Sequence, residues 1–187
     1  MKNHFNQLLA TLLIAGVSLF ASAEEVKLDF VISEGLGSAR PVAVLPFSWR
    51  GAAIEAAEDV AAVIGADLRR SGRFNPMARH QLVQNVDSYD AVNIDLWREK
   101  GIEAVVVGSI SAQADGRLKV SYELVDIFRR QQEVRNGEIM NTQRNRLDSY
   151  AALVEPKNLR FHAHRIADRI YEKLTGEKGA FATRIAY

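Results

Sequence analysis

Two histidines carry the clearest suggestion of chemistry in this sequence, because His162 and His164 are separated by a single residue. On a β-strand, two such side chains share a face and could bind one metal ion. The apolar spacing around them predicts a helix instead, and on a helix positions i and i+2 point roughly 200° apart. We therefore interpret both as surface histidines and expect neither a metal ion nor another cofactor.

A glycine-rich stretch, EGLGSAR, raises the question of a nucleotide site, since Gly35 and Gly37 match the first half of the phosphate-binding motif G-x-G-x-x-G. The sixth position of the motif is Arg40, however. Pro41 and an apolar strand follow where the motif needs the start of a helix. We interpret the two glycines as a flexible hinge.

Catalytic signatures are missing from the sequence. Neither the serine elbow G-x-S-x-G nor the zinc-protease motif H-E-x-x-H occurs. Glu123 and Asp126 lie three residues apart on an expected strand, hence on opposite faces, so they cannot act as an acid–base pair. The chain has no cysteine, which excludes thiol nucleophiles, disulfides and thiolate metal sites. The sequence thus predicts a protein that is not an enzyme and has no catalytic residues.

Five arginines gather within 18 residues, a density that in a cytosolic protein calls for a test of nucleic-acid binding. They are Arg129, Arg130, Arg135, Arg144 and Arg146. Few aromatic residues accompany them, so the stacking surface on which single-stranded bases are bound is lacking. We interpret the arginines as the solvated face of a strand, with docking of an acidic protein partner as the alternative, and expect no nucleic-acid partner.

Length and composition predict one domain with a sizeable core. Of 187 residues, 48% are hydrophobic and 25% are charged, values close to those of ordinary globular proteins. The formal net charge of +1 predicts no bulk attraction to nucleic acid or to an anionic membrane surface. A cysteine-free domain must be stabilised by its core alone, which suits a bacterial periplasmic protein better than a small secreted one.

The start of the chain has the pattern of a secretory signal. Residues 1–23 combine Lys2, the apolar run Leu8–Phe20 and a small-x-small tripeptide that ends at Ala23, so we expect cleavage between Ala23 and Glu24. The apolar run is shorter than the roughly 20 residues that span a bilayer. We therefore expect export to the periplasm without direct insertion into a membrane.

Apolar periodicity predicts an α/β fold of the α+β kind, with a mixed β-sheet covered by helices. The first expected elements are a buried strand at Val42–Phe47 that ends or lies on an edge at Pro46, a helix from Ile54 to near Gly72, and short helices after Pro76 and up to Gly101. The later ones are a strand over 102–113, a two-residue hairpin turn at Asp115-Gly116, a strand over 118–128, a second hairpin at Asn136-Gly137, and a helix over 159–174 that ends at Gly176.

An amphipathic strand pattern follows the expected cleavage site, where Val26, Leu28, Phe30 and Ile32 alternate with mostly polar residues. At a free chain end, tethered by the glycine hinge, such a strand could pair with the exposed sheet edge of a partner. It could equally be an edge strand of the protein's own sheet. The periodicity does not distinguish these two interpretations.

Four stretches of the chain carry a family resemblance: ARPVAVLPFSWRG, DVAAVIGADLRRSGRFNP, GIEAVVVGSI and YEKLTGEKGAFATRIAY. They resemble the N-terminal domain of the TolB family, the periplasmic components of the Tol-Pal system of Gram-negative bacteria. The resemblance covers essentially all of the chain after the signal. It implies a fold similar to the anticodon-binding domain of class II tRNA synthetases, without implying that tRNA is bound.

The resemblance also implies a domain organisation. It gives a signal peptide at 1–23, a partner-binding strand with its flexible joint at 24–38, the TolB-like α/β domain at 39–180, and the start of a β-propeller at 181–187. In the family, the stretch Thr183–Tyr187 is the first strand of a six-bladed propeller, so we expect this chain to be a fragment of a longer protein. Residues 129–158 are longer and more polar than the family leads us to expect.

The function implied by the resemblance is that of a non-enzymatic periplasmic adaptor that links TolA to Pal, maintains outer-membrane integrity and supports constriction during cell division. In the family, the segment after the signal binds the C-terminal domain of TolA, and the propeller docks the lipoprotein Pal. The TolA-binding residues are then Lys27, Leu28, Asp29, Phe30, Val31, Ile32 and Ser33, with Gly35 and Gly37 as the hinge.

Two other classes of protein remain as alternatives. A periplasmic scaffold of the CsgG-like or penicillin-binding-protein-activator kind also uses strands of the VAVLPF type. Such scaffolds usually carry a lipid-modified cysteine, and this chain has none. An exported domain that binds a small ligand is the second alternative, and ligand-dependent thermal protection would reveal it.

Overall fold

The computed structural model describes residues 39–51, 58–129, 131–135, 138–142 and 145–183. Several predictions fall outside these residues: the signal peptide, the cleavage site at Ala23 and Glu24, the strand Lys27–Ser33, and the hinge at Gly35 and Gly37. The described part of the chain begins immediately before the first strand of the domain.

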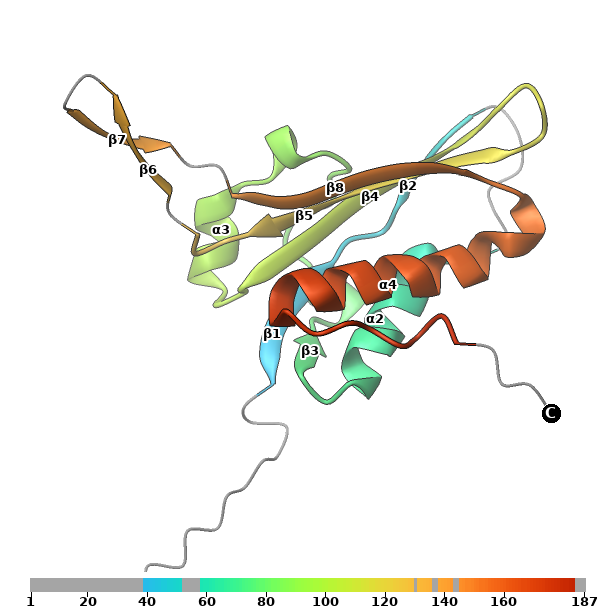
Figure 1. The fold of residues 1–187 in the computed structure, drawn as a ribbon, viewed down its shortest axis with the longest axis horizontal. Coiled ribbons are helices and arrows are strands. Elements are labelled where there is room, and N and C mark those ends of the chain that lie inside the picture. The colour runs from blue at the N-terminus through green and yellow to red at the C-terminus, as the bar shows by residue number, and fades with distance from the viewer. Residues whose placement is uncertain (1–38, 52–57, 130, 136–137, 143–144, 184–187) are drawn as a thin grey trace, which may run out of the picture. The chain divides into compact units, whose positions relative to one another are not determined.

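The central feature is a six-stranded mixed sheet (Figure 1). Its strands are β1 (Arg40–Val44), β2 (Ser48–Arg50), β3 (Phe74–Pro76), β4 (Ala104–Ala112), β5 (Leu118–Asp126) and β8 (Arg146–Val154). The strand order is β3-β1-β4-β5-β8, with β2 also paired to β4. β1 is parallel to both β3 and β4, whereas β4, β5 and β8 are antiparallel to one another in turn. The predicted mixed sheet covered by helices is confirmed.

Proline explains why β1 and β2 are separate strands although both run along β4. The Leu45 N–H still donates to the Val106 carbonyl at 2.9 Å, but Pro46 has no N–H to continue the ladder. Pairing resumes at Ser48. Of the two alternatives for Val42–Phe47, the strand therefore ends at the proline, because β1 lies inside the sheet between β3 and β4 and not on an edge.

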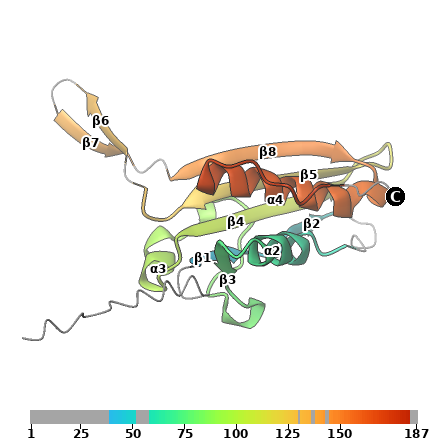
Figure 2. The same cartoon turned by 60° about the horizontal axis from the view of Figure 1, so that its bottom comes forward.

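Alternation along β4 divides the core into two layers. Ala104, Val106 and Ile110 pack on the face covered by α2 (Val60–Arg70) and α4 (Leu159–Thr175). Figure 2 shows these two helices side by side along the strands. Val105 and Val107 point to the opposite face, which is covered by α3 (Ile94–Glu99) and its neighbouring loops. Both faces of β4 are thus buried, as its continuous apolar run predicts.

α2 begins later than the sequence predicts. Asp59 is extended and accepts the Ala62 N–H on its carboxylate at 3.0 Å, which makes it the N-cap of a helix that starts at Val60. The predicted start at Ile54 is therefore wrong for the described residues that precede Val60, while residues 52–57 lie outside the description. The short aspartate side chain satisfies a free N–H better at a helix start than within a helix.

A long segment between β3 and β4 forms the second layer. It contains the 3₁₀ turns η2 (Arg79–Gln81) and η3 (Tyr89–Ala91) before α3, in the region where short helices were predicted. Gln84 joins these pieces, since its amide donates to the Ala91 carbonyl at 2.8 Å and its oxygen accepts the indole N–H of Trp97 at 3.1 Å. Trp97 itself is fully buried.

Two hairpins were predicted, and the turn of the first is described. Between β4 and β5, Gln113 N–H donates to the Arg117 carbonyl and Gly116 N–H to the Gln113 carbonyl, with Gly116 at φ +81°. This is a three-residue loop and not the predicted two-residue turn. The second hairpin pairs β6 (Gln131–Arg135) with β7 (Glu138–Thr142) as a separate two-stranded sheet. That pairing is confirmed, while residues 136–137 themselves lie outside the description.

α4 ends where the sequence predicts. Gly176 adopts the left-handed conformation at φ +79° and donates its N–H to the Glu172 carbonyl at 2.8 Å. The helix buries one continuous stripe, made of Leu159, His162, Ala163, Ile166, Ala167 and Ile170. In the described part of the chain, no helix is long and apolar enough to cross a membrane.

Candidate functional site

The start of β1 is, in sequence, the described element that follows the predicted partner-binding strand. Arg40 opens β1, and its Nε donates to the Glu103 carboxylate at 2.6 Å. Its Nη1 donates to the Leu174 carbonyl at 2.8 Å, and its guanidinium lies 5.9 Å from the centre of the Phe74 ring. The backbone N–H of Arg40 also donates to the Arg73 carbonyl at 3.0 Å. One arginine therefore joins β1 to β3, to the start of β4 and to the end of α4. We call this the Arg40 junction.

A surface depression of about 650 Å³ adjoins the Arg40 junction. It is lined by Arg40, Glu103, Asp126, Phe128, Arg129, Leu147, Lys173 and Leu174. Phe128, a large apolar side chain in this lining, is 51% exposed. The depression is thus an apolar and charged surface next to the point where residues 24–38 join the domain.

Only some arginines of the predicted cluster lie within the described residues. Arg146 forms an ion pair with Glu123 at 3.2 Å and lies over the Tyr89 ring at 4.7 Å. Glu123 also accepts the Tyr89 N–H at 2.7 Å. Arg146 therefore stabilises the loop that carries η3, in addition to being partly exposed. Arg129 lines the depression, whereas Arg130 and Arg144 and the side chain of Arg135 lie outside the description.

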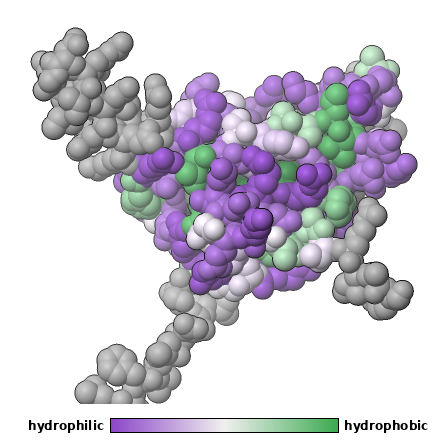
Figure 3. Space-filling view, viewed as in Figure 1, coloured by the Kyte–Doolittle hydropathy of each residue, from purple (hydrophilic) through white to green (hydrophobic). Residues whose placement is uncertain are grey.

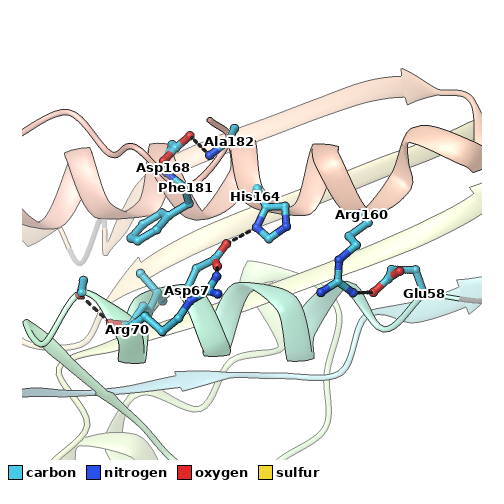
Figure 4. Close-up of polar contacts among 10 residues, drawn as sticks. Glu58, Asp67, Arg70, Arg160, His164, Asp168, Phe181 and Ala182 are labelled. Carbon is cyan, nitrogen blue, oxygen red and sulfur yellow. Dashed lines mark hydrogen bonds and ion pairs between the residues drawn. The ribbon is translucent and has the colours of Figure 1, made fainter. Parts of the chain in front are cut away.

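The prediction of two surface histidines is wrong for His162, and His164 is partly exposed. His162 is 7% exposed and stacks on Tyr150 with ring centres 6.0 Å apart, while His164 Nδ1 lies 2.6 Å from the buried Asp67 carboxylate (Figure 4). The reason is that α4 is covered on two sides, by β8 on one and by α2 on the other. Positions that diverge by roughly 200° therefore both contact a neighbouring element, which buries His162 and covers His164 in part. Among the described residues, no group of three or more His, Cys, Asp or Glu side chains is placed to hold a metal ion.

Asp67 is the buried centre of the contact between α2 and α4. Its side chain is fully buried and accepts from Arg70 on its own helix as well as contacting His164 (Figure 4). A second pair, Arg160 with Glu58 at 2.8 Å, links the start of α4 to the segment just before α2. These contacts serve helix packing, because a buried carboxylate needs such partners.

A second polar network was not predicted from the sequence. The Tyr122 hydroxyl donates to the Asp148 carboxylate, and Arg169 Nη2 donates to the same carboxylate at 3.0 Å. Arg169 Nε donates to the Tyr122 oxygen at 3.1 Å, and its guanidinium lies 4.6 Å from the centre of the Tyr150 ring. Burial, and then the bond to Asp148, raise the pKa of the Tyr122 phenol, so it stays protonated. No sequence motif connects these residues, which come from two strands and a helix.

The segment after α4 folds back along it. The Asp168 carboxylate accepts the N–H groups of Phe181 at 2.6 Å and Ala182 at 3.1 Å (Figure 4). The Phe181 ring meets Tyr171 edge-to-face with centres 5.7 Å apart. A Cβ on Gly179 would lie 2.5 Å from the Asp168 Cα, so only glycine fits there. The predicted strand Thr183–Tyr187 lies outside the description apart from its first residue and stays a prediction.

Comparison with known proteins gives the family. Residues 28–133 match the family model described as the TolB amino-terminal domain. The chain is 41% identical over 186 residues to the Tol-Pal system protein TolB of Histophilus somni strain 2336, which covers 98% of this chain and 40% of that protein. It is also 41% identical over 163 residues to the protein of the same name from Pasteurella multocida strain Pm70, covering 87% of this chain and 35% of that protein.

A solved structure agrees with these relatives. TolB from Acinetobacter baumannii superposes with a TM-score of 0.59 at 28% sequence identity, over 77% of this chain and 30% of that one. The chain spans 35% and 40% of the length of the two curated relatives. The family model covers the predicted partner-binding residues except Lys27, together with the strands that form the Arg40 junction. The chain therefore belongs to the TolB family of Tol-Pal system proteins and contains the amino-terminal domain of that family.

Proposed function

We propose that this chain is the amino-terminal part of a non-enzymatic periplasmic adaptor of the Tol-Pal system. Its leading strand, Lys27–Ser33, binds the C-terminal domain of TolA, and the propeller expected beyond residue 187 docks Pal. The adaptor thereby links TolA to Pal, maintains outer-membrane integrity and supports constriction during cell division. Family membership supports the Tol-Pal role, and the signal pattern of residues 1–23 supports the periplasmic location.

The observation that carries the proposal is the Arg40 junction. Only the six residues from Glu34 to Ala39 separate Ser33 from Arg40. Fully extended, they span roughly 20 Å, because each residue adds at most about 3.6 Å. A partner that captures the strand is therefore held within that distance of the depression beside Arg40. The glycines at 35 and 37 let the strand change direction while Arg40 keeps β1 in place.

Strand addition explains why apolar and polar residues alternate in the leading strand. Leu28, Phe30 and Ile32 fall on one face of an extended chain, where they can enter pockets of a partner, while backbone groups pair with the partner's sheet edge. The strand exchanges between a position packed on its own protein and an extended form captured by TolA. Hydrogen bonds worth about 1 kcal/mol each are enough to shift such a balance.

Deletion of residues 24–33 tests the proposal. Capture of this chain by the immobilised C-terminal domain of TolA should be abolished, while the thermal unfolding midpoint should change little. A matched variant replaces the same ten residues with glycine and serine, which keeps the length and removes the alternation; it should also fail to bind. A synthetic peptide of residues 24–33 should compete with the intact chain. Undiminished capture of either variant would refute the assignment.

A further inference from the structure

The two edges of the sheet differ in how much backbone they leave open. β3, at one edge, has three residues and ends in Pro76. β8, at the other edge along the top of Figure 1, has nine residues, contains no proline and pairs only with β5 in the described part of the chain. A long edge strand presents unpaired N–H and C=O groups that another strand can use. β8 is therefore the better template for a partner.

A groove accompanies this edge. Two adjoining depressions, of about 190 and 470 Å³, lie between β8 and α4 and share His162 and Arg165 as lining residues. Tyr150 of β8 lines the smaller one and Val154 of β8 the larger. We call these two depressions together the α4–β8 groove. Figure 3, which views the molecule from the side of α4, shows a largely hydrophilic face interrupted by separate hydrophobic patches.

The α4–β8 groove has an uncompensated positive charge. Its two acidic residues are already engaged: Asp168 accepts two backbone N–H groups from the C-terminal segment, and Glu155 forms an ion pair with Lys157 at 2.9 Å. Arg169 is paired with Asp148. Arg165 is exposed, and its side chain makes no hydrogen bond or ion pair with any described residue. The groove consequently favours a negatively charged ligand.

His162 supplies a second polar group that lacks a partner. Its Nε2 is buried and forms no hydrogen bond with the described residues, although the residue lines both depressions. Such a buried nitrogen without a partner raises the free energy of the protein, and a ligand that reaches it removes that cost. Burial, and then the charge of Arg165, lower the pKa of the His162 imidazole, so it is neutral near pH 7 and has one donor and one acceptor nitrogen.

We propose that the α4–β8 groove binds an extended acidic segment of a partner protein. The segment adds as a strand to the free edge of β8, places a carboxylate against Arg165 and brings a polar group to His162 Nε2. This goes beyond the adaptor role described above. In the adaptor role, the leading strand of this protein pairs with a partner. In the present proposal, a strand of a partner pairs with β8, at the edge of the sheet opposite β3.

A nine-residue peptide that alternates valine and glutamate, with blocked ends, is a direct probe. Titrated into the ¹⁵N-labelled protein, it should shift the amide resonances of Arg146–Val154 and slow their hydrogen exchange. Arg165→Glu should weaken binding by about tenfold or more, because it reverses the one unpaired cation of the groove. Lys100→Glu, an equal charge reversal beside α3, should leave binding unchanged. A peptide that alternates valine and lysine should not bind.

Several results would overturn the proposal. One is the absence of shifts in β8, and another is equal binding by wild type and Arg165→Glu. If the peptide binds only after residues 24–33 are deleted, the occupant of the edge is the chain's own leading strand and not a partner. Capture by TolA distinguishes this proposal from the proposed adaptor function. Arg165→Glu should weaken binding of the acidic peptide and leave capture by TolA intact.

Discussion

The two faces of the sheet are covered in different ways. On one face, α2 and α4 have 11 and 17 residues and bury six residues each. On the other, α3 has six residues and buries only Trp97. The helices of one layer therefore contribute many buried side chains, whereas α3 contributes one large side chain to a layer that is otherwise built from the sheet and the neighbouring loops. Because hydrophobic stabilisation follows buried apolar area, the α3 layer should be the more sensitive to a single substitution.

The same difference extends to polar groups. The α2/α4 face contains Asp67 and the Tyr122–Asp148–Arg169 network, each satisfied by partners from separate elements. Large, continuous packing excludes water from these groups and holds their partners in place. The Arg40 junction and the α4–β8 groove both use α4, so the surfaces that we propose for partners are supported by the more extensively packed layer.

The largest effect on stability is expected for the α3 layer. Trp97→Ala removes the only buried side chain of α3, together with its bond to Gln84, and should lower the free energy of unfolding by about 3–5 kcal/mol. Urea unfolding followed by circular dichroism measures the loss. Phe128→Ala, at a half-exposed aromatic residue, is the matched control and should cost far less. A loss for Trp97→Ala no larger than the control would contradict the comparison between the faces.

A smaller effect is expected on the α2/α4 face, where packing is tight at Gly108. A Cβ there would lie 2.4 Å from the Phe47 ring and 2.6 Å from the Ser121 carbonyl oxygen. Gly108→Ala should destabilise by about 1–3 kcal/mol, since the neighbours must shift. Gly51→Ala is the control, because its nearest neighbour would be 3.6 Å away. Thermal unfolding distinguishes the two, and equal midpoints for both variants would mean that Phe47 moves aside without cost.

The smallest effect is a pH dependence. The pKa of His162 is lowered by burial and then by Arg165, so the unfolded chain binds this proton more readily than the folded one. Stability is therefore fully present above about pH 6.5 and is lost as the pH falls below it, with a slope of at most about 1.4 kcal/mol per pH unit for one proton. His162→Phe should flatten this slope in urea unfolding series, with His80→Phe as the control at an exposed histidine. If His162→Phe keeps the full slope, another titrating group causes the pH dependence.

Local patterns predicted much of the fold. The continuous apolar run of β4, the alternation of β5, the interruption at Pro46 and the end of α4 at Gly176 all follow from local sequence patterns. The start of α2 was misjudged because an apolar stripe continued past Asp59, and the capping preference prevailed over periodicity. The predicted TolA-binding strand rests on sequence and family alone, since it lies outside the described residues.

By itself, the sequence did not predict β2, β3 and β8, whereas it determined β1, β4, β5, the two long helices and the end of α4, along with the absence of cysteine chemistry and the family of the chain. These depend on residue types and spacings within a few turns or strands. Only the tertiary structure decided that His162 packs on β8 and His164 on α2, that Tyr122 meets Asp148 and Arg169, and that Arg40 joins three elements. Burial and pairing depend on which distant segments meet, and no local pattern specifies that meeting.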